Sequence, residues 1–160
     1  MLKQSKINHE MFHTYQGTKR LGYTYDPGAA GGLAGTDTMV EFHNSGVRDA
    51  KKFSVIESKQ TYSGISGDPN SSVGEITQRT HCGRMVTDWK ADLIGGNGSW
   101  CPMLLGLPPL IDMHSVALHG LFSNGDGALI MMPNGCHKDN LPSKEDIHCH
   151  RLLYTDSGHY

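Results

Sequence analysis

Apolar residues recur every three or four positions at the start of the chain. Five of them roughly follow this spacing before the first glycine: Leu2, Ile7, Met11, Phe12 and Tyr15. A repeat of this length places the apolar side chains on one face of a helix. Because no glycine or proline occurs before Gly17, the pattern predicts a helix over residues 1–16.

A glycine-rich stretch, DPGAAGGLAGTD, occupies residues 26–37. Glycine weakens both helices and strands because it loses more backbone freedom on folding than any other residue. The stretch therefore predicts a long loop. No Lys-Ser or Lys-Thr pair follows the glycines, so the residues do not fit a phosphate-binding P-loop.

Short apolar runs follow, separated by clusters of Gly, Asn, Asp, Pro and Ser. They predict strands at residues 38–43, 52–58, 73–80, 84–89, 115–122, 128–132 and 150–155. The turn signals between them favour hairpins. Two tryptophans and two methionines are expected in the core: Trp89, Trp100, Met131 and Met132. The expected fold class is α+β, with an N-terminal helix followed by a mostly antiparallel, sheet-rich body. We expect a single domain over residues 1–160, with the glycine-rich loop as the alternative internal boundary.

Charge and hydropathy narrow the set of partners. The net charge of −2 argues against the broad basic surface that nucleic acids require, and the basic run at residues 48–52 is interpreted as a solvated face. No apolar stretch approaches the roughly 18 residues of a membrane span. The first ten residues lack the apolar core of a signal peptide. We therefore expect neither a membrane nor a nucleic acid as partner, and the sequence leaves the compartment open.

One motif carries specific chemistry, the His-Glu-x-x-His pattern at His9, Glu10 and His13. On a helix, His9 and His13 point the same way and can bind one zinc ion through neutral imidazole nitrogens. Zinc lowers the pKa of a bound water towards about 7, and Glu10 then takes the proton as hydroxide attacks a carbonyl carbon. Ten histidines in 160 residues favour a metal site but also favour a chance motif. The competing interpretation is a pair of exposed helix histidines without a metal.

The segment HEMFHTYQ, residues 9–16, resembles the active-site helix of zincin metallopeptidases. It is similar in particular to the motif helix of small peptidase domains at the ends of bacterial toxins and effectors. The resemblance implies Zn²⁺ as cofactor, a protein or peptide as substrate, His9 and His13 as ligands and Glu10 as general base. Zincins place strands before this helix, whereas only eight residues precede His9.

The resemblance also implies a third zinc ligand further along the chain. Glu41 is the first choice, because a downstream Glu completes the site in some zincin families. Asp37 is the second choice, since one zincin group uses an Asp near a Gly-Thr pair, and His43 is the third.

Cysteine and histidine also gather near the C-terminus, where five of them lie within fifteen residues: Cys136, His137, His148, Cys149 and His150. They predict a structural zinc site, or alternatively a Cys136–Cys149 disulfide or two buried thiols. On a strand, His148 and His150 share one face and Cys149 lies on the other, so at most four of the five can converge. The four cysteines of the chain are widely spaced, and their redox state stays open.

Three function classes follow from these residues. The leading prediction is a zinc-dependent hydrolase, specifically a peptidase. The second is a non-enzymatic β-rich structural or binding domain with a structural metal or disulfide. The third is a metal-dependent His-Asn-His nuclease, since His119, Asn134 and His148 occur in the required order and the PNGC and WCP segments are similar to pieces of His-Cys box homing endonucleases.

Overall fold

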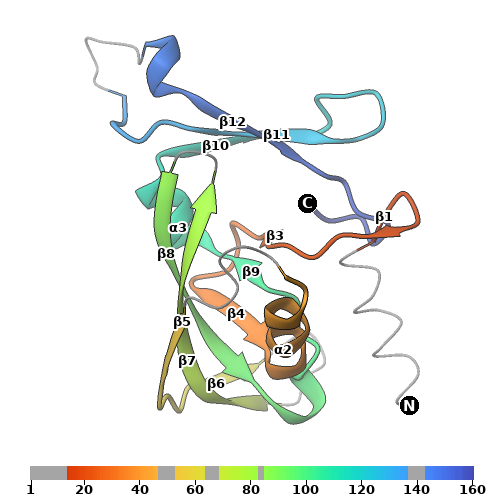
Figure 1. The fold of residues 1–160 in the computed structure, drawn as a ribbon, viewed down its shortest axis with the longest axis vertical. Helices are drawn as coiled ribbons and strands as arrows, with labels where there is room; N and C mark the ends of the chain where they lie inside the picture. Colours follow the sequence, from red (N-terminus) through yellow and green to blue (C-terminus); the bar gives the residue numbers. More distant parts are fainter. Residues whose placement is uncertain (1–13, 47–52, 64–68, 83–84, 137–142) are drawn as a thin grey trace.

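β-Sheets account for most of the regular structure that is described (Figure 1). The computed structural model describes residues 14–46, 53–63, 69–82, 85–136 and 143–160. Within these residues, β1 (Thr14–Tyr15) and β2 (Thr18–Lys19) form a small hairpin. A separate antiparallel sheet has three strands: β10 (Ser115–Leu118), β11 (Gly127–Met131) and β12 (His148–Leu152).

The largest sheet has seven strands in the order β3-β9-β4-β8-β7-β5, with β6 paired to another part of β7. Their bounds are Thr24–Tyr25 (β3), Gly32–Gly35 (β4), Phe53–Ile56 (β5), Thr61–Ser63 (β6), Pro69–Cys82 (β7), Met85–Ile94 (β8) and Leu104–Leu105 (β9). Most neighbours are antiparallel, but β4 runs parallel to β8 and β3 runs parallel to β9. The mostly antiparallel, sheet-rich body expected from the sequence is confirmed.

Helix α2 (Thr36–Asn44) follows β4 directly and buries Thr38, Met39 and Phe42. Helix α3 (Leu107–Asp112) follows β9 and carries proline in its first turn, where the missing N–H is not needed. Two single turns of 3₁₀ helix, η1 (Gly96–Gly98) and η2 (Lys144–Asp146), complete the described helical structure.

Trp89 of β8 lies at the centre of the hydrophobic core and is completely buried. Its indole N–H donates to the carbonyl oxygen of Leu104 at 2.9 Å, and its ring meets Tyr23 edge-on with 4.9 Å between ring centroids. Met131 of β11 is also completely buried in this core. The expected core positions of Trp89 and Met131 are confirmed, whereas Trp100 and Met132 are only half-buried. The two sheets share one core.

The predicted N-terminal helix is wrong within the described residues. Thr14 and Tyr15 form β1 instead, and Gln16 and Gly17 have φ angles of 48° and 71°. Two successive positive φ values are typical of the tight turn that joins two antiparallel strands. The first helix in the described chain is α2, and residues 1–13 lie outside the described residues.

The strand predicted at residues 38–43 is also wrong, because this segment lies within α2. Met39 and Phe42, three residues apart, are the buried apolar positions, and such spacing belongs to a helix face. The other six predicted strands overlap β5, β7, β8, β10, β11 and β12.

The glycine-rich stretch is not a loop throughout, since Gly32–Gly35 forms the strand β4 between β8 and β9. A Cβ atom on Gly32 would lie 2.0 Å from the carbonyl oxygen of Lys90, and one on Gly35 would lie 2.1 Å from that of Ser99. The glycines therefore allow a backbone approach that any side chain would block.

Asp126 joins the N-terminal hairpin to the C-terminal sheet. Its carboxylate is completely buried and accepts hydrogen bonds from Tyr15 Oη at 2.9 Å, Arg151 Nε at 2.6 Å and the Tyr154 N–H at 3.0 Å. Burial alone would raise the pKa of Asp126, but the hydrogen bonds from Tyr154, Tyr15, Arg151 and Asn124 outweigh burial and lower it. The carboxylate is therefore held in its charged form.

Substituting Gly35→Ala is expected to lower the free energy of unfolding by about 3 kcal/mol or more, because the new Cβ would overlap the Ser99 backbone. Gly31→Ala is the matched control, since a Cβ there meets nothing within 4 Å. Urea unfolding of both variants checks the prediction. Equal losses in the two variants would contradict it.

Substituting Asp126→Asn is expected to lower the free energy of unfolding at pH 7 by about 2 kcal/mol, as hydrogen bonds to a buried charge are lost. Because the folded-state pKa of Asp126 is lowered, its contribution is present above about pH 4, the range of an unfolded Asp, and is lost as the pH falls through the folded-state value. The difference between wild type and variant should therefore shrink in acid. Urea unfolding at several pH values measures this, and a pH-independent difference would refute the assignment.

Candidate functional site

The carboxyl ends of the parallel strands β4 and β8 meet at one edge of the large sheet, where Gly35 pairs with Ile94. The chain continues from β4 into α2 and from β8 into the segment 95–103. In sheets with parallel strands, ligands bind preferentially beyond the carboxyl ends of the strands. We call this region the carboxyl-edge site and define it by Asp37, Thr38 and Ser99.

Asp37 projects from the first turn of α2 and is exposed. Ser99 Oγ donates a hydrogen bond to its Oδ2 atom at 2.7 Å. The backbone N–H groups of Asp37 and Thr38 both donate to the carbonyl oxygen of Ser99, at 2.8 and 3.2 Å. The backbone and the carboxylate of Asp37 are therefore both held by Ser99, while the carboxylate stays accessible to solvent.

Thr38 is completely buried beside Asp37. Its Oγ1 atom is the one buried side-chain oxygen or nitrogen without a hydrogen-bond partner in the described part of the chain. A buried hydroxyl left in this state costs about 1–3 kcal/mol. Such groups are rare in native proteins and call for an explanation, of which a functional role is one.

The hairpin of β6 and β7 extends past this edge. Pairing of β7 with β8 ends at Ser72 and Ile94, so residues 69–71 of β7 continue beyond the end of β8 together with β6. The Asn70 side chain comes within 3.9 Å of the position that a Cβ atom on Gly98 would take. The hairpin thus runs beside the segment that carries Ser99.

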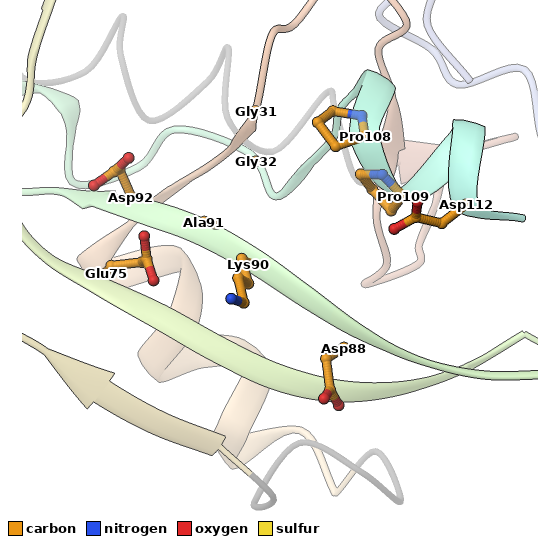
Figure 2. A pocket seen from close by; sticks show the side chains of 10 residues that line it. All are labelled: Gly31, Gly32, Glu75, Asp88, Lys90, Ala91, Asp92, Pro108, Pro109 and Asp112. Atoms are coloured by element: carbon orange, nitrogen blue, oxygen red, sulfur yellow. The ribbon is translucent and has the colours of Figure 1, made fainter.

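A second candidate is an acidic cavity of about 390 Å³ between β7, β8 and α3. Figure 2 shows its charged side chains: Glu75, Asp88, Lys90, Asp92 and Asp112. Glu75 lies directly opposite Asp92 in the β7–β8 pair. Within the described residues, Glu75, Asp88 and Asp112 make no hydrogen bond or ion pair, so negative charge is concentrated around this cavity.

Asp92 differs from the other carboxylates of the cavity because it has hydrogen-bond donors. Ser58 Oγ donates to it at 2.7 Å, and Tyr62 Oη donates to its other oxygen. Burial and the hydrogen bond to Asp92 raise the pKa of Tyr62 to about 12, so the phenol remains a donor at neutral pH. No group of three His, Cys, Asp or Glu side chains in the described ranges is arranged to hold a metal ion.

The predicted zinc ligands are only partly described. His9, Glu10 and His13 lie outside the described residues. Glu41 lies on α2, where its carboxylate forms an ion pair with the Lys19 ammonium group. Of the alternative third ligands, Asp37 belongs to the carboxyl-edge site. His43 stacks on Phe53 with 4.2 Å between ring centroids, and its Nε2 atom lies 3.3 Å from Gln78 Oε1.

The predicted C-terminal cluster is divided between the two faces of the three-stranded sheet. His148 and His150 lie on the face that carries Leu129 and Met131, whereas Cys149 lies on the opposite face and is exposed. Cys136 and Cys149 are both free thiols, and His137 lies outside the described residues. The described members of the cluster therefore do not converge on one point.

The three residues of the predicted nuclease site are also separated. His119 follows β10 next to the Leu118–Ala128 pair and stacks on Tyr160, whereas His148 pairs with Met131 at the other end of β11. Three residues along a strand correspond to about 10 Å. Asn134 donates to Asp146 Oδ1 at 3.3 Å rather than to either histidine.

Sequence reasoning missed Ser99 and Thr38 as site residues. The signal that would have found them is the parallel pairing of β4 with β8, which brings residues 37 and 99 together across 62 positions. That pairing was hidden because the glycines of β4 predicted a loop.

No helix in the described ranges combines the length and apolar character needed to cross a membrane. Comparisons of the chain with family models, with curated proteins and with solved structures find no match.

Proposed function

We propose that this chain is a hydrolase in which the Asp37 carboxylate activates a water molecule. The observation that supports the proposal is the geometry of Asp37. Its carboxylate is open to solvent yet held by the Ser99 hydroxyl, and its backbone N–H is held by the Ser99 carbonyl. Catalytic groups need this combination of access and fixed position, because a rate gain comes from holding the reacting atoms in place.

In the proposed reaction, a water molecule bound to Asp37 attacks a carbonyl carbon of the substrate. The free oxygen of the carboxylate accepts the proton as the new C–O bond forms, and the Asp37 carboxyl then returns this proton to the leaving group as the old bond breaks. Ser99 keeps the other oxygen in place throughout. The next residue along the chain, Thr38, has a buried hydroxyl without a hydrogen-bond partner in the described part of the chain. In the proposed site this hydroxyl is available for a hydrogen bond.

A second carboxyl group would assist this chemistry, because two carboxyls that share a site titrate at different pH and can act as acid and base. Glu41 lies one turn beyond Asp37 on the same face of α2. Its carboxylate is engaged in an ion pair with Lys19, so in this arrangement we assign it an electrostatic effect on Asp37 rather than the role of proton donor. Glu41→Gln therefore tests whether the neighbouring charge matters.

An extended peptide is the substrate class that best fits the fold around the site. In the described part of the chain β5 pairs only with β7, and all four of its residues are exposed. Such an edge can add an extended peptide by backbone hydrogen bonds. β5 runs parallel to β4 and lies about 14 Å from it. A peptide bound along β5 would therefore extend towards the same edge of the sheet as the carboxyl-edge site.

Asp37→Asn is expected to lower kcat by about 100-fold or more, because the amide cannot accept a proton from water. Ser99→Ala should give a smaller loss, since the carboxylate remains but is less well held. Hydrolysis of a mixed peptide library, followed by mass spectrometry over about pH 4 to 8, provides the measurement. The matched control is Glu145→Gln, an exposed acid elsewhere on the surface. Full activity of Asp37→Asn would refute the proposal.

The zinc-dependent peptidase is the second candidate, and the His-Glu-x-x-His motif favours it. His9 and His13 would hold the ion and Glu10 would take the proton from its bound water. Glu41 can serve as third ligand only if its ion pair with Lys19 opens.

Two variants separate the candidates. If zinc chemistry operates, Glu10→Gln should abolish hydrolysis while bound zinc, measured by elemental analysis, is retained. With Glu41 or His43 as the third ligand, Asp37→Asn should then leave activity intact, whereas with Asp37 as the third ligand the same substitution should lower the amount of bound zinc. If Asp37 is the base, a zinc chelator and Glu10→Gln should both leave hydrolysis unchanged. Absence of any peptide hydrolysis would favour the other function class given above, a β-rich binding domain without enzymatic activity.

A further inference from the structure

The turn that follows β11 brings two sulfur atoms together. The Gly135 N–H donates to the carbonyl oxygen of Met132 at 2.7 Å, which closes a four-residue turn. Pro133 and Gly135 hold its second and fourth positions, where a type I turn favours proline and glycine. The chain folds back at this turn, and the Sγ atom of Cys136 lies 3.3 Å from the Sδ atom of Met132. Cys136 is exposed and is a free thiol, so a dissolved ion can reach it.

A histidine lies against the same turn. His114 directly precedes β10, and the chain there pairs with the end of β11, because the Met132 N–H donates to the carbonyl oxygen of Met113 at 3.1 Å. A Cβ atom on Gly135 would lie 3.3 Å from the Nε2 atom of His114. The imidazole therefore sits beside the residue that immediately precedes Cys136. The His114 side chain is exposed, and it has no hydrogen-bond or ion-pair partner among the residues that the structure describes.

The backbone of His114 is held in a strained conformation. Its φ angle is 45°, in the left-handed region that residues with a side chain rarely adopt, although histidine adopts it more often than most. Its N–H donates to the carbonyl oxygen of Ile111 at 2.8 Å, which fixes the residue at the end of α3. Residues kept in such conformations cluster at functional sites, because the surrounding structure must impose them. The strain of His114 therefore agrees with a role for its imidazole.

A thiolate, a thioether and an imidazole together select one class of metal ion. The thioether of methionine is a soft ligand and favours Cu(I), whereas zinc sites are built from thiolate, imidazole and carboxylate ligands. Two sulfur atoms that bind one ion at about 2.3 Å, with an angle of about 90–120° between them, are about 3.3–4 Å apart. The 3.3 Å between the sulfurs of Cys136 and Met132 lies at the lower end of this range. Small side-chain rotations would therefore suffice for both to bind.

We propose that Cys136, Met132 and His114 form a binding site for Cu(I). The Cys136 thiol releases its proton to solvent as the Cu–S bond forms, and the copper stays monovalent throughout. Met132 and His114 bind as neutral ligands, so the complex of one Cu(I) ion with one thiolate carries no net charge. The three-stranded sheet lies at one end of the molecule, away from α2 and the carboxyl-edge site (Figure 1). Copper binding is therefore independent of the proposed hydrolysis.

Competition for Cu(I) against the chelator bicinchoninate, in the absence of oxygen, tests the proposal. The wild type should withdraw Cu(I) from the chelator. Met132→Leu should weaken Cu(I) binding at least about tenfold, because leucine preserves the apolar volume but lacks the sulfur ligand. Met131→Leu is the matched control, a neighbouring methionine buried in the core, and should bind Cu(I) like the wild type. His114→Asn should also weaken binding, since asparagine tolerates a positive φ angle but lacks the imidazole.

Protection of the thiols from iodoacetamide gives a second measurement, on the unchanged chain. An equimolar amount of Cu(I) should slow the alkylation of Cys136, because the metal occupies the sulfur lone pair that attacks the reagent. Cys149, an exposed thiol on β12, is the internal control and should react at the same rate with and without copper. Peptide mapping by mass spectrometry assigns each rate to its cysteine.

Three results would each overturn the proposed copper site. The first is a wild type that does not compete for Cu(I). The second is a Met132→Leu or His114→Asn variant that binds Cu(I) as tightly as the wild type, which would mean that the thiol binds copper without them. The third is protection of Cys149 equal to that of Cys136. Circular dichroism of each variant checks that it is folded before binding is measured.

Discussion

The close backbone approach around β4 is the constraint on which the large sheet depends. β4 lies between β8 and β9, and the missing side chains of Gly32 and Gly35 make room for the carbonyl groups of Lys90 and Ser99. Gly106 has the same role at the start of α3, where a Cβ would lie 2.4 Å from the carbonyl oxygen of Gly31. This approach brings the Ser99 segment against the start of α2, and so the position of Asp37 follows directly from the packing of the sheet.

Carboxylates serve two different purposes in this fold. Asp126 and Asp156 hold the chain together: Asp126 binds Tyr15 and Arg151, and Asp156 accepts the backbone N–H groups of Gln16 and Gly17 at 3.1 Å each. Around the acidic cavity, Glu75 faces Asp92 directly across two strands, and like charges so placed repel. Asp92 also joins segments, because Ser58 and Tyr62 donate hydrogen bonds to it. The uncompensated repulsion therefore comes mainly from the other acids of the cavity.

The sequence predicted the parts of the fold that depend on local pattern. Alternation and turn residues located β5, β7, β8, β10, β11 and β12, and Trp89 and Met131 proved to be core residues. The elements that the sequence did not predict, β1 and β4, depend on contacts between residues far apart in the chain. Tyr15 is drawn into β1 by its hydrogen bond to Asp126, and β4 is a strand because its neighbours supply pairing that its glycines do not favour locally. Of the candidate site, the sequence singled out only Asp37, and only as an alternative zinc ligand. Its contact with Ser99 was not predicted, because that contact requires the unforeseen pairing of β4 with β8.

The contact between Tyr15 and Asp126 has a consequence for the order in which the chain folds. The two residues are 111 positions apart, and the bonds from Asp156 to Gln16 span 140. Closing such long loops costs entropy before any contact compensates for it, and topologies of high contact order fold slowly. During synthesis the β1–β2 hairpin is made long before Asp126 and Asp156, which hold it in the folded protein. The complete set of these hydrogen bonds can therefore form only after residue 156 has been added to the chain.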